Sequence, residues 1–551
     1  MSLPAALRIP TDEPPGWGQG GGRVLYRNGR VRSSVDPRAQ AMVVEGHRVA
    51  WVGSDAAAEG LGAAAAASHV VDLMGALVTP AFVDAHVHTT ATGLALDGLD
   101  LSAARSLSEA LMTVEQYCRS RRGGIVLGTG WDDSAWPERR PPTAAELDRA
   151  SYGGVVYLAR ADVHSAVVSS AALAAVPEAR ALPGMGNGGM LRLQAHAAVR
   201  RAVLAAIGVG QRTAAQRRAR AHAAARGIGC LHEMAGPDVS SADDLAALLA
   251  LAAEEPGPLV VGYYGSLGDV ETPQRLGVSG AGGDLFCDGS LGSHTAALST
   301  PYADAPGSGP LRHDAAEIAG HVVACSRAGL QAGFHAIGDR ALQEVLDGFS
   351  AAAEEVGIGA VLAGRHRLEH AEMLTRAHVA EAARLGLVVS VQPAFDARWG
   401  GPGGLYEQRL GADRARGLNP FSALAAAGVP LAIGSDSPVT PLDPWGGVRA
   451  AVRHHTSGAG LSARAAFTAA TRGGWRAARV DGVGDLAPGA PAHFAVWEAG
   501  DLAVQLPDNR VAAWSTDPRA AVAGLPDLDG RLPTCRATVV AGRVVYGDPS
   551  A

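Results

Sequence analysis

Short apolar runs alternate with alanine-rich amphipathic segments over the middle of the chain. Apolar runs of this length are typical of buried parallel strands, and segments such as DAAEIAGHVVACSRAG have the periodicity of helices. The alternation predicts an α/β fold, a (β/α)8 TIM barrel in residues 80–480. We expect its strands at Ala81–His88, Ile228–Glu233, Leu259–Gly265, Asp284–Asp288, Gln331–His335, Arg365–His370, Leu387–Gln392 and Pro430–Asp436.

The two ends of the chain have a different pattern. Short β-like pieces separated by turns fill residues 23–79, where Asn28-Gly29 is a hairpin signal, and they return in residues 481–549. Because these β-rich ends flank the long middle, we predict one small β-sandwich domain formed by both termini. Residues 1–22, rich in proline and glycine, are expected to be a flexible N-terminus.

A long insertion separates the first two predicted barrel strands. Residues 100–225 contain two further strand-like runs, GIVLGTGW and VVYLARAD. An insertion after a barrel strand lies at the end of the barrel where the active sites of this fold are built. We therefore expect this segment to cap the barrel mouth and to supply specificity.

Metal-capable side chains recur where the predicted strands end. His86 and His88 are two residues apart, so a strand places both imidazoles on one face. His335, His370 and Asp436 close three other predicted strands. An isolated histidine is more often structural, but the repeated placement at one end of the barrel predicts a common site. Imidazole and carboxylate ligands suit a divalent metal, with zinc as the first choice and iron or manganese also compatible.

Composition and charge narrow the class of protein. The net charge of −7 over 551 residues gives no basic surface for nucleic acid or for a membrane. No apolar run reaches the length of a membrane span, and the first residues lack the pattern of a signal peptide. The five cysteines are scattered without a CxxC pair, which favours a reduced, cytoplasmic protein. We expect a small-molecule substrate as partner, and the sequence leaves a homo-oligomer open.

A family resemblance covers nearly the whole chain. The motifs VTPAFVDAHVH, DGSLGSHTAAL, HAIGDRAL, HRLEHAEM and LAIGSDSPVTPLDPWGGV occur in this order. With them the chain resembles the amidohydrolase superfamily, and within it the YtcJ-like (amidohydrolase 3) group related to N-substituted formamide deformylases. The resemblance implies a metal-bearing barrel with a terminal β-sandwich that hydrolyses non-peptide C–N bonds by metal-activated water.

The same resemblance implies roles for the histidines and the aspartate at the strand ends. His86 and His88 would hold the more buried metal, and His335 and His370 the second. Asp436 would bind metal and act as general base and then as general acid. His370 would also stabilise the developing oxyanion.

The chain departs from these relatives at Asp284. Relatives have a lysine here that is carboxylated and bridges two metals, whereas all 47 basic residues of this chain are arginine, so no carboxylated lysine can form. Asp284 could bridge two metals itself, the site could hold one metal, or Asp284 could be a structural strand end beside a weakened site. We favour the first hypothesis, because the polar cluster would otherwise have no evident use.

Three further residues are candidates for substrate contact. The resemblance suggests Trp131 and His164 in the cap, although burial of Trp131 in the cap core is an equal alternative. His294 stands where relatives usually have arginine, and a histidine in a surface loop explains it equally well. Asp288 is expected to order its loop rather than to act in catalysis.

Other functional classes fit the sequence less well. The chain has no G-x-S-x-G motif of a serine hydrolase, and no G-x-G-x-x-G motif follows an early strand. Two alternatives stay open: a non-enzymatic binding or assembly protein on this fold, and a mononuclear metal-dependent deaminase. Retention of the four histidines and Asp436 argues against the first, and the HAIGD motif and the full-length resemblance favour an amide hydrolase over the second.

Overall fold

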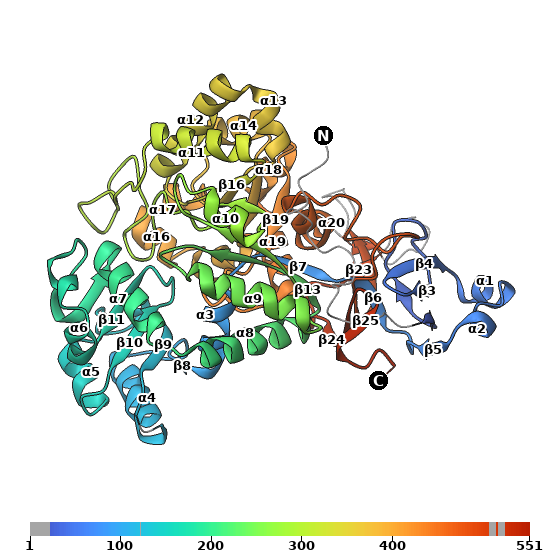
Figure 1. Ribbon diagram of the computed structural model, residues 1–551, viewed down its shortest axis with the longest axis horizontal. Helices are drawn as coiled ribbons and strands as arrows, with labels where there is room; N and C mark the ends of the chain where they lie inside the picture. Colours follow the sequence, from blue (N-terminus) through green and yellow to red (C-terminus); the bar gives the residue numbers. More distant parts are fainter. Residues whose placement is uncertain (1–21, 122, 506–513, 516–523, 551) are drawn as a thin grey trace.

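The computed structural model describes residues 22–121, 123–505, 514–515 and 524–550. Apart from Gly22, the predicted flexible segment 1–22 lies outside the described residues. Figure 1 shows a central barrel with a cap at one end and the β-rich ends of the chain at the other. Among the helices of the described ranges, none is both long enough and apolar enough to cross a membrane.

The barrel sheet confirms the predicted fold class. Its strands pair in parallel in the order of the sequence, and Asp436 N donates to His86 O at 2.8 Å, where the last strand meets the first. Every residue of most of these strands is buried, because one face packs into the barrel and the other against helices. The strands are β7 (Phe82–Val87), β13 (Ile228–Ala235), β14 (Leu259–Tyr264), β15 (Gly280–Ala281), β16 (Gln331–Ala336), β17 (Arg367–His370), β18 (Val388–Val391) and β19 (Leu431–Ile433).

Amphipathic helices form the outer wall of the barrel. They bury their apolar side chains against the strands, as where Phe82 of β7 meets the Trp445 ring edge-on at a centroid distance of 5.1 Å. The wall includes α3 (Thr89–Asp97), α8 (Val209–Ala224), α9 (Ala242–Glu254), α11 (Ala315–Ala328), α12 (Asp339–Val356), α14 (Arg376–Arg384) and α19 (Pro444–Val452).

The fourth strand lies earlier than predicted. The prediction Asp284–Asp288 is only partly right: the strand is β15, which Gly282 and Gly283 end with φ of 155° and 88°. Within the predicted segment only Phe286 pairs with another described residue, in a parallel bridge with His335. A Cβ atom on Gly282 would lie 2.2 Å from Gly333 N, so only glycine fits beside the next strand. Apart from this bridge the following residues form a loop, in which Leu285 and Cys287 are buried and Phe286 is half-buried, which explains why they resemble a strand in the sequence.

The cap is a second α/β layer with its own five-stranded sheet of order β12-β11-β10-β9-β8. Both strand-like runs of the insertion lie in it, as β9 and β10. Helix α8, inside the predicted insertion, packs instead on the barrel helix α3. The cap consists of β8 (Leu99–Asp100), α4 (Leu107–Ser120), β9 (Val126–Trp131), α5 (Ala144–Ala150), β10 (Val156–Arg160), β11 (Ser165–Val168), α6 (Ser170–Ala174), β12 (Met190–Arg192) and α7 (Leu193–Ala205).

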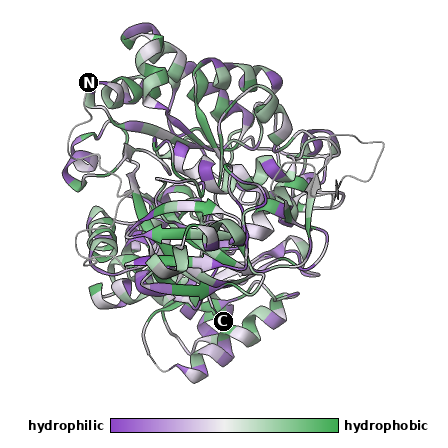
Figure 2. Ribbon diagram, turned by 90° about the vertical axis from the view of Figure 1, so that its right-hand side faces the viewer, coloured by the Kyte–Doolittle hydropathy of each residue, from purple (hydrophilic) through white to green (hydrophobic). Residues whose placement is uncertain are grey.

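The two ends of the chain meet in the terminal β region. One sheet contains only N-terminal strands, and a second joins both ends in the order β2-β6-β20-β24-β25. Tyr26 of the first sheet and Phe494 of the second meet edge-to-face at 5.2 Å within a shared core. Figure 2 shows strands of this region largely in green. The strands are β1 (Arg23–Arg27), β3 (Ala41–Glu45), β4 (Arg48–Gly53) and β5 (His69–Asp72), with β2 (Arg30–Val31), β6 (Leu77–Pro80), β20 (Phe494–Glu498), β24 (Thr534–Val540) and β25 (Arg543–Gly547).

Candidate metal centre

Strands at the two ends of the barrel sheet bring His86, His88 and Asp436 together. Both histidines are buried at the end of β7, where the chain turns into α3. Asp436 follows β19 with a φ of 53°. Its Oδ1 atom lies 3.5 Å from His86 Nε2 and 3.1 Å from His88 Nε2. These three residues form a group able to hold one metal ion.

Asp284 lies at the centre of the cluster. Its Oδ1 atom is 3.5 Å from His86 Nε2, 3.3 Å from His335 Nδ1 and 3.7 Å from His370 Nε2. Its Oδ2 atom is 3.1 Å from His88 Nε2. One buried carboxylate thus faces all four histidines, and His86, Asp284 and His370 form a second group able to hold a metal ion.

Second partners fix the orientation of three of the imidazoles. His86 Nδ1 lies 2.9 Å from Glu369 Oε2, His88 Nδ1 lies 3.0 Å from Met234 O, and His370 Nδ1 lies 2.7 Å from Gln392 Oε1. Each contact leaves Nε2 directed at the carboxylates. Such partners orient metal ligands and raise their basicity. His335 is reversed: its Nδ1 atom faces Asp284 and its Nε2 atom lies 3.2 Å from Gly289 O.

Two unpartnered nitrogens test whether these residues fit a metal. The Nε2 atoms of His86 and His370 are buried without a hydrogen-bond partner among the described residues. Burial would raise the pKa of the Asp284 carboxyl, but the surrounding imidazoles, His86 foremost, hold that pKa well below its ordinary value. A buried carboxylate beside buried free imidazole nitrogens is a donor set that suits zinc or a similar divalent ion, so the residues fit.

The cap reaches this cluster through His164. The His164 ring lies 5.1 Å from the His335 ring and 5.6 Å from the Phe286 ring, centroid to centroid. Asp162, two residues earlier, is buried and accepts hydrogen bonds from Ser290 Oγ at 2.7 Å and Ser293 Oγ at 2.8 Å. These bonds fix the end of β10 onto the loop that follows Asp284, so His164 lines a hollow beside His335 and His370.

The other two candidates for substrate contact, Trp131 and His294, do not lie beside the cluster. Trp131 is fully buried in the cap core, where its Nε1–H donates to Leu158 O at 2.9 Å. Its position on β9 turns the ring toward the cap helices rather than toward the barrel. His294, with a φ of 57°, pairs with Asp304 Oδ1 at 2.9 Å and does not line the cavities at the metal centre.

Asp288 orders its loop, as expected from the sequence. Its carboxylate accepts three backbone N–H bonds, from Ile337 at 3.0 Å, Gly338 at 2.8 Å and Ala297 at 2.9 Å. These bonds tie the segment after Asp284 to the end of β16. The loop is thereby fixed in the position that directs Asp284 into the cluster.

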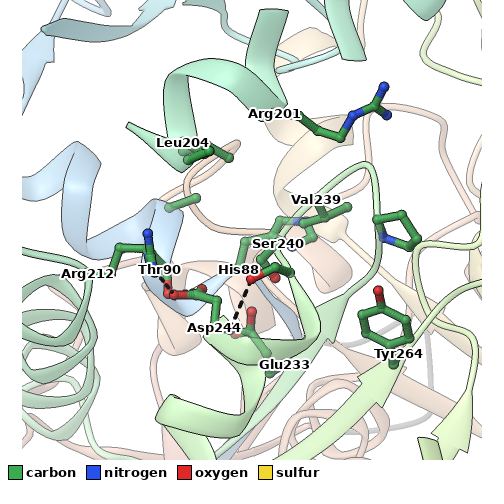
Figure 3. A pocket seen from close by; sticks show the side chains of 14 residues that line it. His88, Thr90, Arg201, Leu204, Arg212, Glu233, Val239, Ser240, Asp244 and Tyr264 are labelled. Carbon is green, nitrogen blue, oxygen red and sulfur yellow. Dashed lines mark hydrogen bonds and ion pairs between the residues drawn. The ribbon is translucent and has the colours of Figure 1, made fainter. Parts of the chain in front are cut away.

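A large cavity of about 430 Å³ opens beside His88. It lies between α7 of the cap and the residues that follow β13, and apolar side chains such as Leu204 and Val239 line much of it. Figure 3 shows Arg212, Thr90 and Asp244 on one side of this cavity and Tyr264 on the other. The cavity can take a sizeable apolar group next to the metal centre.

A smaller hollow of about 20 Å³ lies on the side of His335 and His370. These two residues lie at the ends of the fifth and sixth strands, whereas the large cavity lies over the first three. The two spaces therefore flank the metal centre across the barrel mouth.

Sequence reasoning did not single out Glu369, Glu372, Gln392, Trp399 or Tyr406. Only Gln392 gave a usable signal, as a polar residue at the end of a predicted strand.

Comparisons with known proteins agree with the fold. The profile of the amidohydrolase family matches residues 69–546. Putative amidohydrolase YtcJ of Bacillus subtilis (strain 168) is 28% identical over 414 residues, 70% of this chain and 75% of that protein. N-substituted formamide deformylase of Arthrobacter pascens is 28% identical over 501 residues, 81% and 86% of the two chains.

A further relative and a solved structure extend the comparison. Protein LONG AFTER FAR-RED 3 of Arabidopsis thaliana is 28% identical over 516 residues, 86% of each chain. The crystal structure of an uncharacterized metal-dependent hydrolase from Pyrococcus furiosus is 27% identical, with a TM-score of 0.68 over 86% of this chain and 98% of that one. The profile match over most of the chain confirms the resemblance: the chain belongs to the amidohydrolase family, in its YtcJ-like group.

Proposed function

We propose that this protein is a metal-dependent hydrolase that cleaves a non-peptide C–N bond, of amide or formamide type, in a small molecule. The convergence of four imidazoles on the Asp284 carboxylate, with two buried Nε2 atoms left without a partner, supports this function most directly. Family membership and the similarity to metal-dependent hydrolases support it further. The similarity to a formamide deformylase supports the class of bond.

The four histidines and two aspartates would hold two zinc ions. His86, His88 and Asp436 would hold the first, and His335 and His370 the second, with Asp284 between them. When bound, a divalent metal lowers the pKa of a coordinated water toward neutrality and polarises a carbonyl group.

The protein's own residues would orient the substrate and move the proton. The Asp436 carboxylate lines the small hollow and faces the cluster, so it can take a proton from the attacking water and return it to the leaving nitrogen. His370, fixed by Gln392, lies beside the same space and would stabilise the charge that develops on the carbonyl oxygen. The cap, which reaches the cluster through His164, would exclude bulk water during the reaction and so strengthen both effects.

Separate observations favour this function over the two alternatives. The similarity to N-substituted formamide deformylase favours an amide hydrolase over a deaminase. The acids near the sixth strand do not decide, because Glu369 is engaged by Arg367 and His86 but Glu372 Oε2 has no hydrogen-bond partner within the described ranges. A binding or assembly protein would have no need for unpartnered buried imidazole nitrogens, which destabilise a fold that leaves them empty.

Elemental analysis combined with a hydrolysis assay tests the proposal. We expect about two metal ions per chain after purification without chelator, as in other two-metal sites. Chelation should abolish the release of amine from a panel of N-substituted formamides and acetamides, and added zinc should restore it. Asp436→Asn should lower kcat by about 10²-fold to 10⁴-fold with the fold intact. A metal-loaded protein that hydrolyses none of these amides, or an Asp436→Asn variant with unchanged kcat, would contradict the proposal.

A further inference from the structure

Three buried polar atoms around the small hollow lack partners. Glu372 Oε2, Tyr406 Oη and Trp399 Nε1 have no hydrogen-bond partner in the described part of the chain. All three residues line the hollow, and their exposed fractions are only 3%, 3% and 6%. Each unsatisfied buried polar group destabilises the fold, so three beside one hollow indicate a missing occupant.

The barrel loops bring these residues next to the metal centre. Glu372 follows β17 two residues after His370, Trp399 ends α15 (Pro393–Trp399), and Tyr406 lies in α16 (Leu405–Leu410). The Tyr406 hydroxyl is near Glu372, but the two groups do not meet in hydrogen-bond geometry. The Phe395 ring of α15 stacks on the His370 ring at 6.0 Å. The hollow is therefore bounded on one side by the metal-centre residues themselves.

The chemistry of the three groups restricts the occupant. The indole N–H and the phenol O–H offer two donors, and the Glu372 carboxylate offers an acceptor. A cation would satisfy Glu372 but not the two donors, and an anion such as a carboxylate would satisfy the donors but offer no N–H or O–H to Glu372. An uncharged group with both an acceptor and a donor satisfies all three. The volume of about 20 Å³ limits it to a small group rather than a ring.

We propose that this hollow is a substrate subsite for a small, uncharged amide-type group that lies beside the scissile bond. Its carbonyl oxygen accepts from Tyr406 and Trp399, and its N–H donates to Glu372. The inference rests on the proposed hydrolase function, and it narrows the substrates to small molecules with two neighbouring amide-type groups, such as ureides. The larger apolar part of the substrate then occupies the cavity across the barrel mouth.

Four probes of nearly equal shape test this assignment on the metal-loaded protein. Acetamide has the acceptor and the donor, acetone only the acceptor, acetate a negative charge and acetamidinium a positive charge. Their dissociation constants are measured by saturation-transfer NMR for the unmodified protein and for Tyr406→Phe and Glu372→Met. Tyr264→Phe removes a hydroxyl from the large cavity and is the matched control. Thermal unfolding verifies that each variant is folded.

We expect acetamide to bind more tightly than acetone, and each of the two subsite variants to weaken acetamide about threefold to tenfold, the effect of one hydrogen bond. Tyr264→Phe should leave acetamide binding unchanged. The assignment would be overturned if neither subsite substitution changed the dissociation constant of acetamide. It would also be overturned if acetate or acetamidinium bound more tightly than acetamide and the substitutions weakened that binding. The probes report binding without turnover. If the substitutions weaken acetamide binding but the protein hydrolyses no amide, the subsite is supported and only the proposed function is refuted.

Discussion

Asp284 Oδ2 lies 3.1 Å from His88 Nε2, while Asp284 Oδ1 lies 3.3 Å from His335 Nδ1. This short carboxylate therefore spans from the first barrel strand to the fifth. It does so because β15 ends at Ala281 and the glycine turn after it directs the chain over the barrel mouth. The backbone thus supplies reach that the short aspartate side chain lacks.

Replacing Asp284 tests whether it binds metal. Asp284→Asn keeps the size of the side chain but removes the charge that faces four imidazoles. Since even indirect partners of metal ligands contribute about 10-fold to 100-fold in affinity or activity, we expect at least a 100-fold loss of activity and about one metal ion fewer per chain by elemental analysis. Asp304→Asn, in the His294 pair, is the control. If Asp284→Asn binds as many metal ions as the unmodified protein, Asp284 is not a metal ligand and its role is structural.

The partner of His370 gives a second test. Gln392→Met removes the amide that holds His370 Nδ1 at 2.7 Å and leaves no buried charge unpaired. Zinc affinity, measured by competition with a fluorescent chelator, should fall about 10-fold to 100-fold. Gln343→Met is the matched control. Gln343 Oε1 lies 3.1 Å from His378 Nε2, a similar contact outside the cluster, so its loss should leave zinc affinity unchanged. Equal zinc affinity in the two variants would contradict the role of Gln392.

Burial of His366 predicts a dependence of stability on pH. His366 is fully buried under the barrel, where it accepts a hydrogen bond from Ala332 N at 2.9 Å. Burial, with smaller effects of Arg479 and His321, lowers its pKa to about 3, against about 6.5 in an unfolded chain. Below pH ~6.5 this histidine is protonated in the unfolded state but stays neutral in the folded state. The stability that depends on neutral His366 is therefore fully present above this pH and is lost as the pH falls toward about 3.

Denaturant unfolding at about pH 7.5 and about pH 5 measures this loss. His366→Asn retains an acceptor for Ala332 N but does not titrate. The unmodified protein should lose about 2 kcal/mol more than this variant between the two pH values. Parallel losses in both proteins would show that His366 is protonated in the folded state or is not buried.

Two cap variants separate a residue that contacts substrate from one that stabilises the cap. His164→Ala removes a ring that lies against His335 and should lower kcat/KM about tenfold, as expected for the loss of about 1.4 kcal/mol of transition-state binding. Trp131→Phe removes the hydrogen bond to Leu158 O and part of a fully buried ring, and should cost about 2–4 kcal/mol in unfolding free energy with kcat/KM unchanged. A lower kcat/KM in Trp131→Phe without a change in stability would reverse these roles.

The sequence by itself determined the barrel and the positions of the histidines at its mouth. All strands of a parallel barrel end on the same side, so His86, His335 and His370 had to converge once their strands were recognised. This inference needs only the local pattern and one topological rule. The same rule made Gln392 recognisable as a strand-end residue that the sequence reading did not use.

Only the tertiary structure decided which other residues join them. Leu285 and Cys287, after Asp284, are buried in a loop as they would be in a strand, so hydrophobicity could not distinguish the two. The face of β9 that Trp131 occupies depends on how the cap helices pack. Glu372, Trp399 and Tyr406 meet because two loop helices fold back onto the mouth. Such contacts depend on loop geometry and on partners far along the chain, which no local pattern encodes.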